Sequence, residues 1–414
     1  EPRNNLLKIL GVTFGVAVAI GDMIGSGILR APSSIASVLP EAGLIMGLWV
    51  AGALQATLAA NVMSELGTAY PQSGGGYIYA QRAFGDIGGL IVGWASWLAF
   101  VAGTAAQAIS FANFLPILWP WSQTHTMGVA LAMLIAMFGA NFVGLREGRA
   151  LQEATSFIKA LMLAVFCVAA VLYVPPSKPL PMMVAAAPLL GWATVVGAYQ
   201  LVRGAYAGWD TAFYFGEELV NPGRDLPRAT FIGLALTAGL DLLVNGALLL
   251  SLGTKGVAAT PLPFTLVLAQ FGVAAKFLFA FTALVTVASC ANANIMGGPR
   301  IVYALAREGL LPKFLTYVNK GGTPIGAMAL TALFVLGVTL SGTFDLVFGL
   351  IGTMNSVGAI ILVMALFVLR RTSPDLPRPF RAWGYPLLPA ISFVLETSVL
   401  LLYSAADTLG IEFA

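Results

Sequence analysis

Long apolar stretches, separated by short polar connections, recur along the whole chain. Many of them approach or exceed the ~20 residues that a helix needs to cross a bilayer. Eleven spans are predicted, near 12–37, 41–69, 86–116, 127–145, 151–174, 190–216, 229–252, 273–299, 324–341, 344–369 and 384–405. A further segment at 260–272, TPLPFTLVLAQFG, predicts a short helix outside the membrane. The pattern predicts an all-α polytopic membrane protein.

The composition supports this class. Apolar residues make up 58% of the 414 residues and charged residues only 9%, whereas soluble domains carry roughly 25% charged residues. The net charge of +3 is too small to indicate nucleic-acid binding. Cys167 and Cys290 both lie in apolar stretches, so neither a disulfide framework nor a metal site is expected. No cofactor is expected, and the first ten residues lack the features of a signal peptide.

Basic residues are distributed unequally between alternate connections. One side holds fourteen: Arg3, Lys8, Arg82, Arg146, Arg149, Arg224, Arg228, Arg307, Lys313, Lys320, Arg370, Arg371, Arg378 and Arg381. The other side holds Lys178 and Lys255. Because basic connections stay in the cytoplasm, the N-terminus is expected there. An odd number of spans then places the C-terminal tail outside.

The first predicted span contains IGSGIL at 24–29, where two glycines flank a serine. Each glycine weakens a helix by about 1 kcal/mol relative to alanine. An unwound stretch at membrane depth is tolerated only where it lines a cavity enclosed by protein. There the N–H groups at the start of a half-helix suit a carboxylate. The stretch therefore predicts a broken helix with a binding role.

A second interruption occurs in the sixth span, RGAYAGWDT at 203–211, with Gly204 and Gly208. Glycines also allow close packing between helices, and either motif alone fits that reading as well. However, two interruptions five spans apart, among polar residues, are typical of transporters built from inverted repeats. Together they favour a substrate site between the two spans.

Three longer motifs resemble those of a known family. They are IGSGI with ELGTAYPQSGGGYIYAQRAFG (65–85), AYAGWDTAFYFGEELVNPGRDLPRA (205–229) and NANIMGGPRIVYALAREGLLP (292–312). They resemble the amino acid–polyamine–organocation superfamily, and the second is similar to its L-type branch. The resemblance implies a five-plus-five inverted-repeat (LeuT-type) transporter fold in a single domain, 1–414. The repeats would cover about 12–174 and 190–369, with an additional helix at 384–405. Relatives commonly have twelve spans, and eleven are expected here.

The resemblance also implies a substrate site, carried over residue by residue. The N–H groups of Gly25, Ser26 and Gly27, with the Ser26 hydroxyl, would bind the substrate carboxylate. The α-ammonium group would bind to the carbonyls of Gly204, Ala205 and Ala207, and the residues close to the pocket would be Ile24, Tyr206, Gly208 and Asp210.

The chain departs from the family pattern at two of these positions. Many relatives have a gating phenylalanine where this chain has Gly204, so the pocket is wider unless another aromatic residue closes it. Asp210 stands where L-type relatives often have asparagine, which changes the charge near the amine.

Lys159 lies about a third of the way into the fifth span. In sodium-independent relatives, a lysine at this motif places its ammonium group where sodium binds in sodium-coupled ones. The resemblance implies that Lys159 bridges the carbonyl of Gly21 to the hydroxyls of Thr286 and Ser289. The alternative is a side chain that extends to the cytoplasmic interface.

Other charged residues within or beside the spans allow several roles. Asp22 shares a helix face with Ser26 and either binds a proton or fixes the helix by hydrogen bonds, which we favour. Arg203 pairs with a carboxylate such as Asp210, faces the outer surface or binds an acidic substrate, in that order of preference. Glu217 and Glu218 are expected to form gate or loop salt bridges. They lie at the cytoplasmic end of the sixth span near Arg224 and Arg228, while Asp241, Asp345 and Glu396 receive no role.

Other functional classes fit the chain less well. The single histidine, His125, falls in an outer connection, and no GxGD motif occurs, so an intramembrane enzyme is not expected. Sensors built on transporter folds tend to carry long soluble tails, whereas short tails are expected here. A channel needs a continuous polar lining, whereas the polar residues here cluster midway along the spans. In animal L-type relatives, a cysteine between spans 3 and 4 bonds to a glycoprotein. The corresponding PILWPWSQTHTM has no cysteine, so no covalent partner is expected.

The sequence therefore predicts a sodium-independent secondary transporter of amino acids that works by alternating access. Its partners would be the lipid bilayer and a small amino acid substrate, first of all a neutral L-amino acid. Exchange and proton-coupled uptake both remain open, as do cationic amino acids or polyamines as substrates. The expected location is the cytoplasmic membrane of a bacterium, and the oligomeric state is open.

Overall fold

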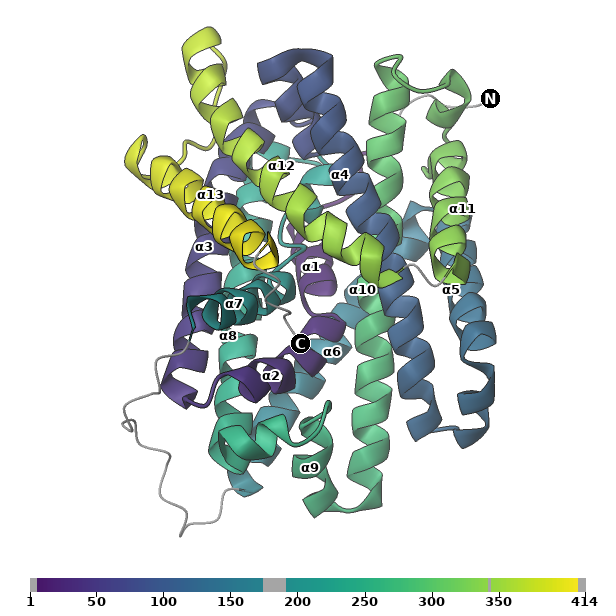
Figure 1. The fold of residues 1–414 in the computed structure, drawn as a ribbon. Helices are drawn as coiled ribbons and strands as arrows, with labels where there is room; N and C mark the ends of the chain where they lie inside the picture. The colour runs from purple at the N-terminus through teal and green to yellow at the C-terminus, as the bar shows by residue number, and fades with distance from the viewer. Residues whose placement is uncertain (1–5, 174–190, 342–343, 409–414) are drawn as a thin grey trace.

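The computed structural model describes residues 6–173, 191–341 and 344–408, and the regular structure within these ranges is helical (Figure 1). The α-helices are α1 (Val12–Met23), α2 (Ser26–Val38), α3 (Ala42–Ala69), α4 (Gly76–Phe114), α5 (Thr126–Val143), α6 (Leu145–Tyr173), α7 (Trp192–Ala205), α8 (Pro222–Ala258), α9 (Phe264–Leu268), α10 (Val273–Arg307), α11 (Ile325–Ser341), α12 (Phe344–Thr372) and α13 (Leu387–Thr408). Short 3-10 helices are η1 (Leu115–Ile117), η2 (Pro120–His125), η3 (Thr211–Tyr214), η4 (Ala269–Phe271) and η5 (Lys313–Thr316). The predicted all-α fold is confirmed.

The helices account for the predicted spans. Within the described ranges, nine helical stretches are long and apolar enough to cross a membrane, and the first comprises α1 and α2 together. α11 is a shorter apolar helix of 17 residues. α7 has only 14 residues and covers the first half of the predicted sixth span. These two helices and the nine long stretches occupy the places of the eleven predicted spans.

Several predicted boundaries were wrong because the helices continue beyond their apolar parts. In α4 the predicted start at 86 was correct for the spanning part, because α4 begins at Gly76 but is interrupted at Gly85, whose φ of +73° is not helical. α8 begins at Pro222 instead of 229. The first turns of α4 and α8 include polar side chains, and hydropathy detects only the part of a helix suited to hydrocarbon. The span ends at 174 and 190, and Arg3 and Lys178 of the charge comparison, lie outside the described residues.

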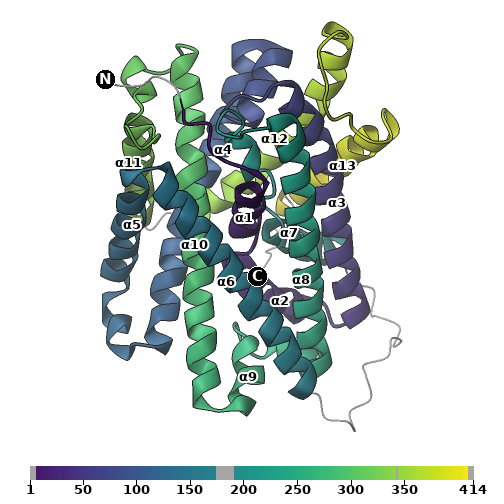
Figure 2. The same cartoon turned by 180° about the vertical axis from the view of Figure 1, so that it is seen from behind.

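α1 occupies the centre of the bundle. It packs against α6, α8 and α10, and it stands in the middle of both views (Figures 1 and 2). α5 and α11 lie at one edge of the bundle, and α3 and α13 lie at the opposite edge. Eight of the twelve residues of α1 are buried, so this helix is enclosed by protein on nearly every side.

α6 has two chemically different faces. Gly148, Gln152, Ser156 and Lys159 recur at every third or fourth position on its buried face. Large apolar side chains cover the opposite face, where Leu172 is 75% exposed. An exposed apolar face of this length suits contact with lipid. α6 therefore turns a polar stripe towards α1 and α10 and an apolar surface outwards.

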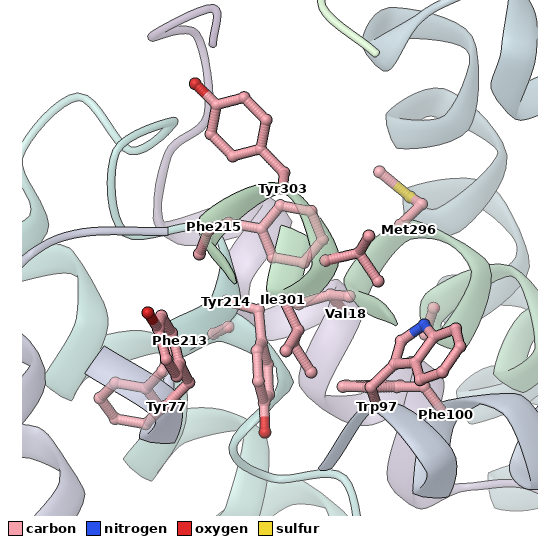
Figure 3. Close-up of a cluster of buried hydrophobic side chains, with 14 of the residues drawn as sticks. Val18, Tyr77, Trp97, Phe100, Phe213, Tyr214, Phe215, Met296, Ile301 and Tyr303 are labelled. Atoms are coloured by element: carbon pink, nitrogen blue, oxygen red, sulfur yellow. The ribbon is translucent and has the colours of Figure 1, made fainter. Parts of the chain in front are cut away.

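An aromatic cluster packs beside the N-terminal half of α1. Figure 3 shows the side chains of 213–215 gathered near those of Trp97, Phe100 and Tyr303. The ring of Phe215 lies edge-on to that of Phe14, with centroids 5.1 Å apart. Such pairs contribute about 0.5–1.5 kcal/mol beyond the area they bury. The cluster fixes the segment that follows α7 against α1, α4 and α10.

Candidate substrate site at two broken helices

The first predicted break is present between α1 and α2. α1 ends at Met23 and α2 begins at Ser26. Between them, Ile24 (φ −84°, ψ 84°) and Gly25 (φ −118°, ψ −149°) lie outside the helical region. The break leaves the carbonyl end of α1 beside the N–H end of α2.

Close packing explains the glycines at this break. A Cβ atom on Gly25 would lie 2.9 Å from Cys290 Sγ and 3.0 Å from Gln107 Nε2. A Cβ atom on Gly27 would lie 3.3 Å from the Cα of Ala205 in α7. Larger residues would force these neighbours apart, so the glycines keep the backbone bare where the two broken helices meet.

The second break follows α7. The helix ends at Ala205, turns occupy 206–210, and η3 begins at Thr211. Gly208 has a φ of +102°, and a Cβ atom there would lie 2.6 Å from the Asp22 side chain. Both the conformation and the lack of space require glycine at this position.

Gly204 differs from the prediction because it does not interrupt the helix. It is the second-last residue of α7, its surface is exposed, and a Cβ atom there would meet nothing within 4 Å. A single glycine is tolerated in a helix, and the unwinding begins after Ala205. The Gly204 carbonyl accepts a hydrogen bond from the N–H of Ala207 at 3.3 Å.

Lys159 lies directly beside the first break. Its side chain is completely buried, and Nζ donates hydrogen bonds of 2.7 Å to the carbonyls of Gly21 and Ile24. These carbonyls belong to the C-terminal end of α1, the negative end of its helix dipole. A side chain that extends to the membrane surface does not fit this burial. The implied contact with Gly21 is present.

The hydrogen bonds that the resemblance implied between Lys159 and the hydroxyls of α10 are not formed by the described residues. Ser289 Oγ instead accepts a hydrogen bond from Gln152 Nε2 at 3.3 Å. The buried Thr286 hydroxyl has no hydrogen-bond partner among the described residues. The ammonium group is directed along α1 to Ile24, so the prediction that it also binds Thr286 and Ser289 was wrong.

Gln152 makes the connection to α10 that was assigned to Lys159. Its Nε2 lies 3.3 Å from the Ala17 carbonyl, and its Oε1 accepts a 2.8 Å hydrogen bond from Asn292. A Cβ atom on Gly21 would lie only 1.6 Å from Gln152 Nε2. The polar stripe of α6 thus packs directly on α1, and glycine at 21 is needed for that contact.

Asp22 joins three segments of the site. Its carboxylate accepts a hydrogen bond from the Thr211 hydroxyl of η3. The Cys290 thiol of α10 lies 3.2 Å from the Asp22 backbone carbonyl and 3.5 Å from its carboxylate. Gly208 packs against the same side chain. These contacts agree with the hydrogen-bonding role that the sequence favoured.

Two other predicted pocket residues make contacts inside the protein. Asp210 accepts a 3.1 Å hydrogen bond from the Tyr214 hydroxyl. Tyr206 is 2% exposed, and its ring lies edge-on to that of Trp49 in α3 at 5.7 Å. Tyr206 therefore packs between the broken helix and α3.

Arg203 forms an internal ion pair, but its partner is not Asp210. Its guanidinium binds the carboxylate of Glu396 in α13 at 2.6 Å. Gln55 of α3 donates a 2.7 Å hydrogen bond to the same carboxylate, which is almost completely buried. Glu396, which had no role from the sequence, thus ties α7 to the helix that follows the repeats.

The predicted salt bridges after the second break use other partners. Glu218 pairs with Arg300 at 3.0 Å, and Glu217 pairs with Arg307 at 2.6 Å, both in α10. Arg224 instead pairs with its neighbour Asp225. The sequence placed these glutamates near Arg224 and Arg228 because those arginines follow closely in the chain, whereas the fold brings α10 closer.

Gln107 of α4 is a site residue that the sequence reasoning missed. Its Oε1 accepts a 3.2 Å hydrogen bond from the backbone N–H of Ser26. The available signal was one of two amides within the apolar third span, in GTAAQAIS at 103–110, the other being Asn113. The orientation of the Gln107 side chain towards the break depends on the packing of α4 and could not be predicted from the sequence.

This geometry can be compared with known proteins. The family model described as amino acid permease matches residues 11–412. The chain belongs to this family. Its members are transport proteins, which bears out the predicted class of a membrane transporter rather than an enzyme.

Among the relatives of this permease, the large neutral amino acids transporter small subunit 2 of Mus musculus is 26% identical, covering 96% of the chain and 76% of the relative. The b(0,+)-type amino acid transporter 1 of Mus musculus is 27% identical, with shares of 96% and 82%. The serine/threonine exchanger SteT of Bacillus subtilis (strain 168) is 24% identical, with shares of 96% and 92%.

Proposed function

We propose that this permease exchanges neutral L-amino acids across the membrane by alternating access, without sodium. Lys159 carries the proposal. Its ammonium group occupies a buried position between α6 and the broken end of α1. A fixed cation there stabilises the break by itself, so no sodium ion is needed to join the two helices.

The polarity of the broken helices supports a zwitterionic substrate. α2 presents the positive N–H end of a helix, and α7 ends nearby with the negative carbonyl end of another. In the proposal, the N–H groups of Gly25, Ser26 and Gly27 bind the carboxylate. The carbonyls of Ala205 and Ala207, with that of Gly204, bind the α-ammonium group.

Exchange is the proposed coupling mode because Lys159 acts as a donor to two carbonyls. In the proposal, the ammonium group keeps both bonds throughout the cycle, so that substrate on each side, and not a proton, drives the conformational change. The name of the Bacillus relative, a serine/threonine exchanger, is consistent with this mode.

The same proposal includes the arrangement of the chain in the membrane. Repeats at 12–174 and 190–369 each begin with a broken helix, and α13 follows them. The excess of basic residues in alternate connections supports a cytoplasmic N-terminus. The match to a bacterial relative over 92% of its length supports a bacterial cytoplasmic membrane. A connection without cysteine at 116–127 supports the absence of a disulfide-linked partner.

Uptake into proteoliposomes tests the function. Vesicles preloaded with a neutral amino acid should take up labelled amino acid at least tenfold faster than empty vesicles, with sodium or choline outside. Uptake into empty vesicles that depends on sodium would contradict the proposal. Uptake that requires an imposed proton gradient would replace exchange by proton symport.

A further inference from the structure

Gln107 provides the cap of the half-helix that begins at the first break. Gln107 is 7% exposed, and its side chain reaches from α4 to the N–H of Ser26. Ser26 is the first residue of α2, and the N-cap residue, Gly25, has no side chain to serve as a cap. An amide 81 positions away in the sequence fills this role.

A cap of this kind has a clear physical reason. The first N–H groups of a helix lack partners within the helix and need an acceptor from elsewhere. Such a group, left unpaired in a buried site, costs free energy. The Gln107 amide oxygen meets this need at Ser26.

The same N–H group is a donor for the substrate carboxylate in the function proposed above. One N–H group has one hydrogen, which points to one acceptor. The substrate carboxylate and the Gln107 oxygen therefore compete for it. The charge of the substrate carboxylate decides this competition, because an ionised acceptor forms a stronger hydrogen bond at a helix N-terminus than a neutral amide oxygen does.

We infer that Gln107 is an exchangeable cap, which the substrate carboxylate displaces when it binds, and that it thereby determines selectivity for ligands with an ionised carboxylate. This inference rests on the proposed function. A neutral amide suits the role, because an incoming anion meets no negative charge. A glutamate here would hold α2 with a charged acceptor and repel the substrate.

Two substitutions separate charge from shape at this position. Gln107→Glu keeps the length of the side chain and adds a negative charge, and Gln107→Met keeps the volume and removes the acceptor. Binding of L-leucine and of its carboxamide, L-leucinamide, is measured by titration calorimetry on the purified full chain. The carboxamide retains the amine and the side chain but has no carboxylate.

The exchangeable cap predicts a charge-specific pattern. Gln107→Glu should weaken leucine binding more than tenfold and change leucinamide binding less than threefold. Gln107→Met should bind leucine at least as tightly as the unmodified chain, because no competing acceptor remains. If Gln107→Glu does not fold, the Gln107→Met result alone supports or contradicts the inference.

Three results would overturn the inference. Equal losses for leucine and leucinamide in Gln107→Glu would indicate a purely structural residue. Unchanged leucine binding in that variant, or a more than tenfold loss in Gln107→Met, would show that the cap is not displaced. If no amino acid binds to the unmodified chain, the proposed function itself fails, which distinguishes the two ideas.

Discussion

The two breaks differ in how tightly the protein holds them. Between α1 and α2 the backbone unwinds over Ile24 and Gly25 only. Lys159 binds the carbonyl end of α1, and Gln107 binds the N–H end of α2. After α7 the chain makes turns over 206–210 before η3. Its fixed points there are Gly208 against Asp22 and the aromatic cluster, whereas Gly204 faces open space.

This difference suggests a division of labour between the breaks. All amino acid substrates share the α-carboxylate, so a short and rigid break suits its recognition. Side chains vary, and an open wall at Gly204 can accept them without rearrangement of the scaffold. The rigid break would then set the chemical class of the substrate, while the open break sets its size.

The largest effect is expected from Lys159→Ala. The substitution leaves two buried carbonyls without a donor, and each costs about 1–3 kcal/mol. The melting temperature should fall, and transport should decrease roughly 100-fold if about 2.7 kcal/mol of that stabilisation acts in the transport cycle. Lys255→Ala, at an exposed lysine, is the matched control. Full activity of Lys159→Ala, or sodium-stimulated uptake by the unmodified chain, would remove Lys159 from the mechanism.

A comparable loss, in substrate affinity, is expected from Gly27→Leu. Even its Cβ atom would lie 3.3 Å from the Ala205 backbone, so the remaining side chain enters the space meant for the carboxylate. A decrease in affinity of about 100-fold corresponds to about 2.7 kcal/mol. Thermal shift with added substrate measures it. Gly47→Leu controls for folding, because a Cβ atom at Gly47 meets nothing within 4 Å. Substrate stabilisation equal to that of the unmodified chain would place the site elsewhere.

A smaller effect on stability is expected at Asp22, which connects the two breaks. Asp22→Ala removes the acceptor of the Thr211 hydroxyl and should lower the free energy of unfolding by about 1–3 kcal/mol. Asp22→Asn keeps an acceptor oxygen and should lose less than half as much. Denaturation in detergent compares the two variants. Equal losses would mean that the charge, and not the hydrogen bond, is what matters at this position.

The smallest and most selective effect is expected from Gly204→Phe at the open break. A phenylalanine would fill the space around this residue, so transport of leucine should slow several-fold more than transport of alanine. Competing uptake of the two amino acids measures the ratio. Gly204→Ala, which adds only a methyl group, should leave the ratio unchanged. Equal slowing of both substrates by Gly204→Phe would indicate damage to α7 instead of a narrower pocket.

Local patterns in the sequence were sufficient to predict the breaks and the broad fold. The glycines around Ser26 and at Gly208 mark the breaks in the sequence, and the structure leaves no room for larger side chains there. The family resemblance added the contact of Lys159 with Gly21. Both features depend on short segments whose residue types can be recognised directly in the sequence.

Contacts between distant helices could not be predicted in the same way. The second acceptor of Lys159, the partner of Arg203 and the direction of Gln107 all depend on side-chain rotamers and on helix rotation. Neighbours in sequence were poor guides, because Glu218 binds Arg300 of α10 and not an arginine of its own connection. Hydropathy also located the start of α8 seven residues late, since it responds to hydrocarbon depth and not to backbone conformation.

The ammonium group of Lys159 is covalently attached to the chain, and this has a bioenergetic consequence. A dissolved ion fills a site only as its concentration allows, whereas a tethered one has constant occupancy and pays no entropy of capture from solution. The permease would keep the same contact between α6 and the broken end of α1 at low and at high salt concentration. It would in turn draw no work from an ion gradient through that contact, so accumulation of one amino acid would be limited by the supply of another.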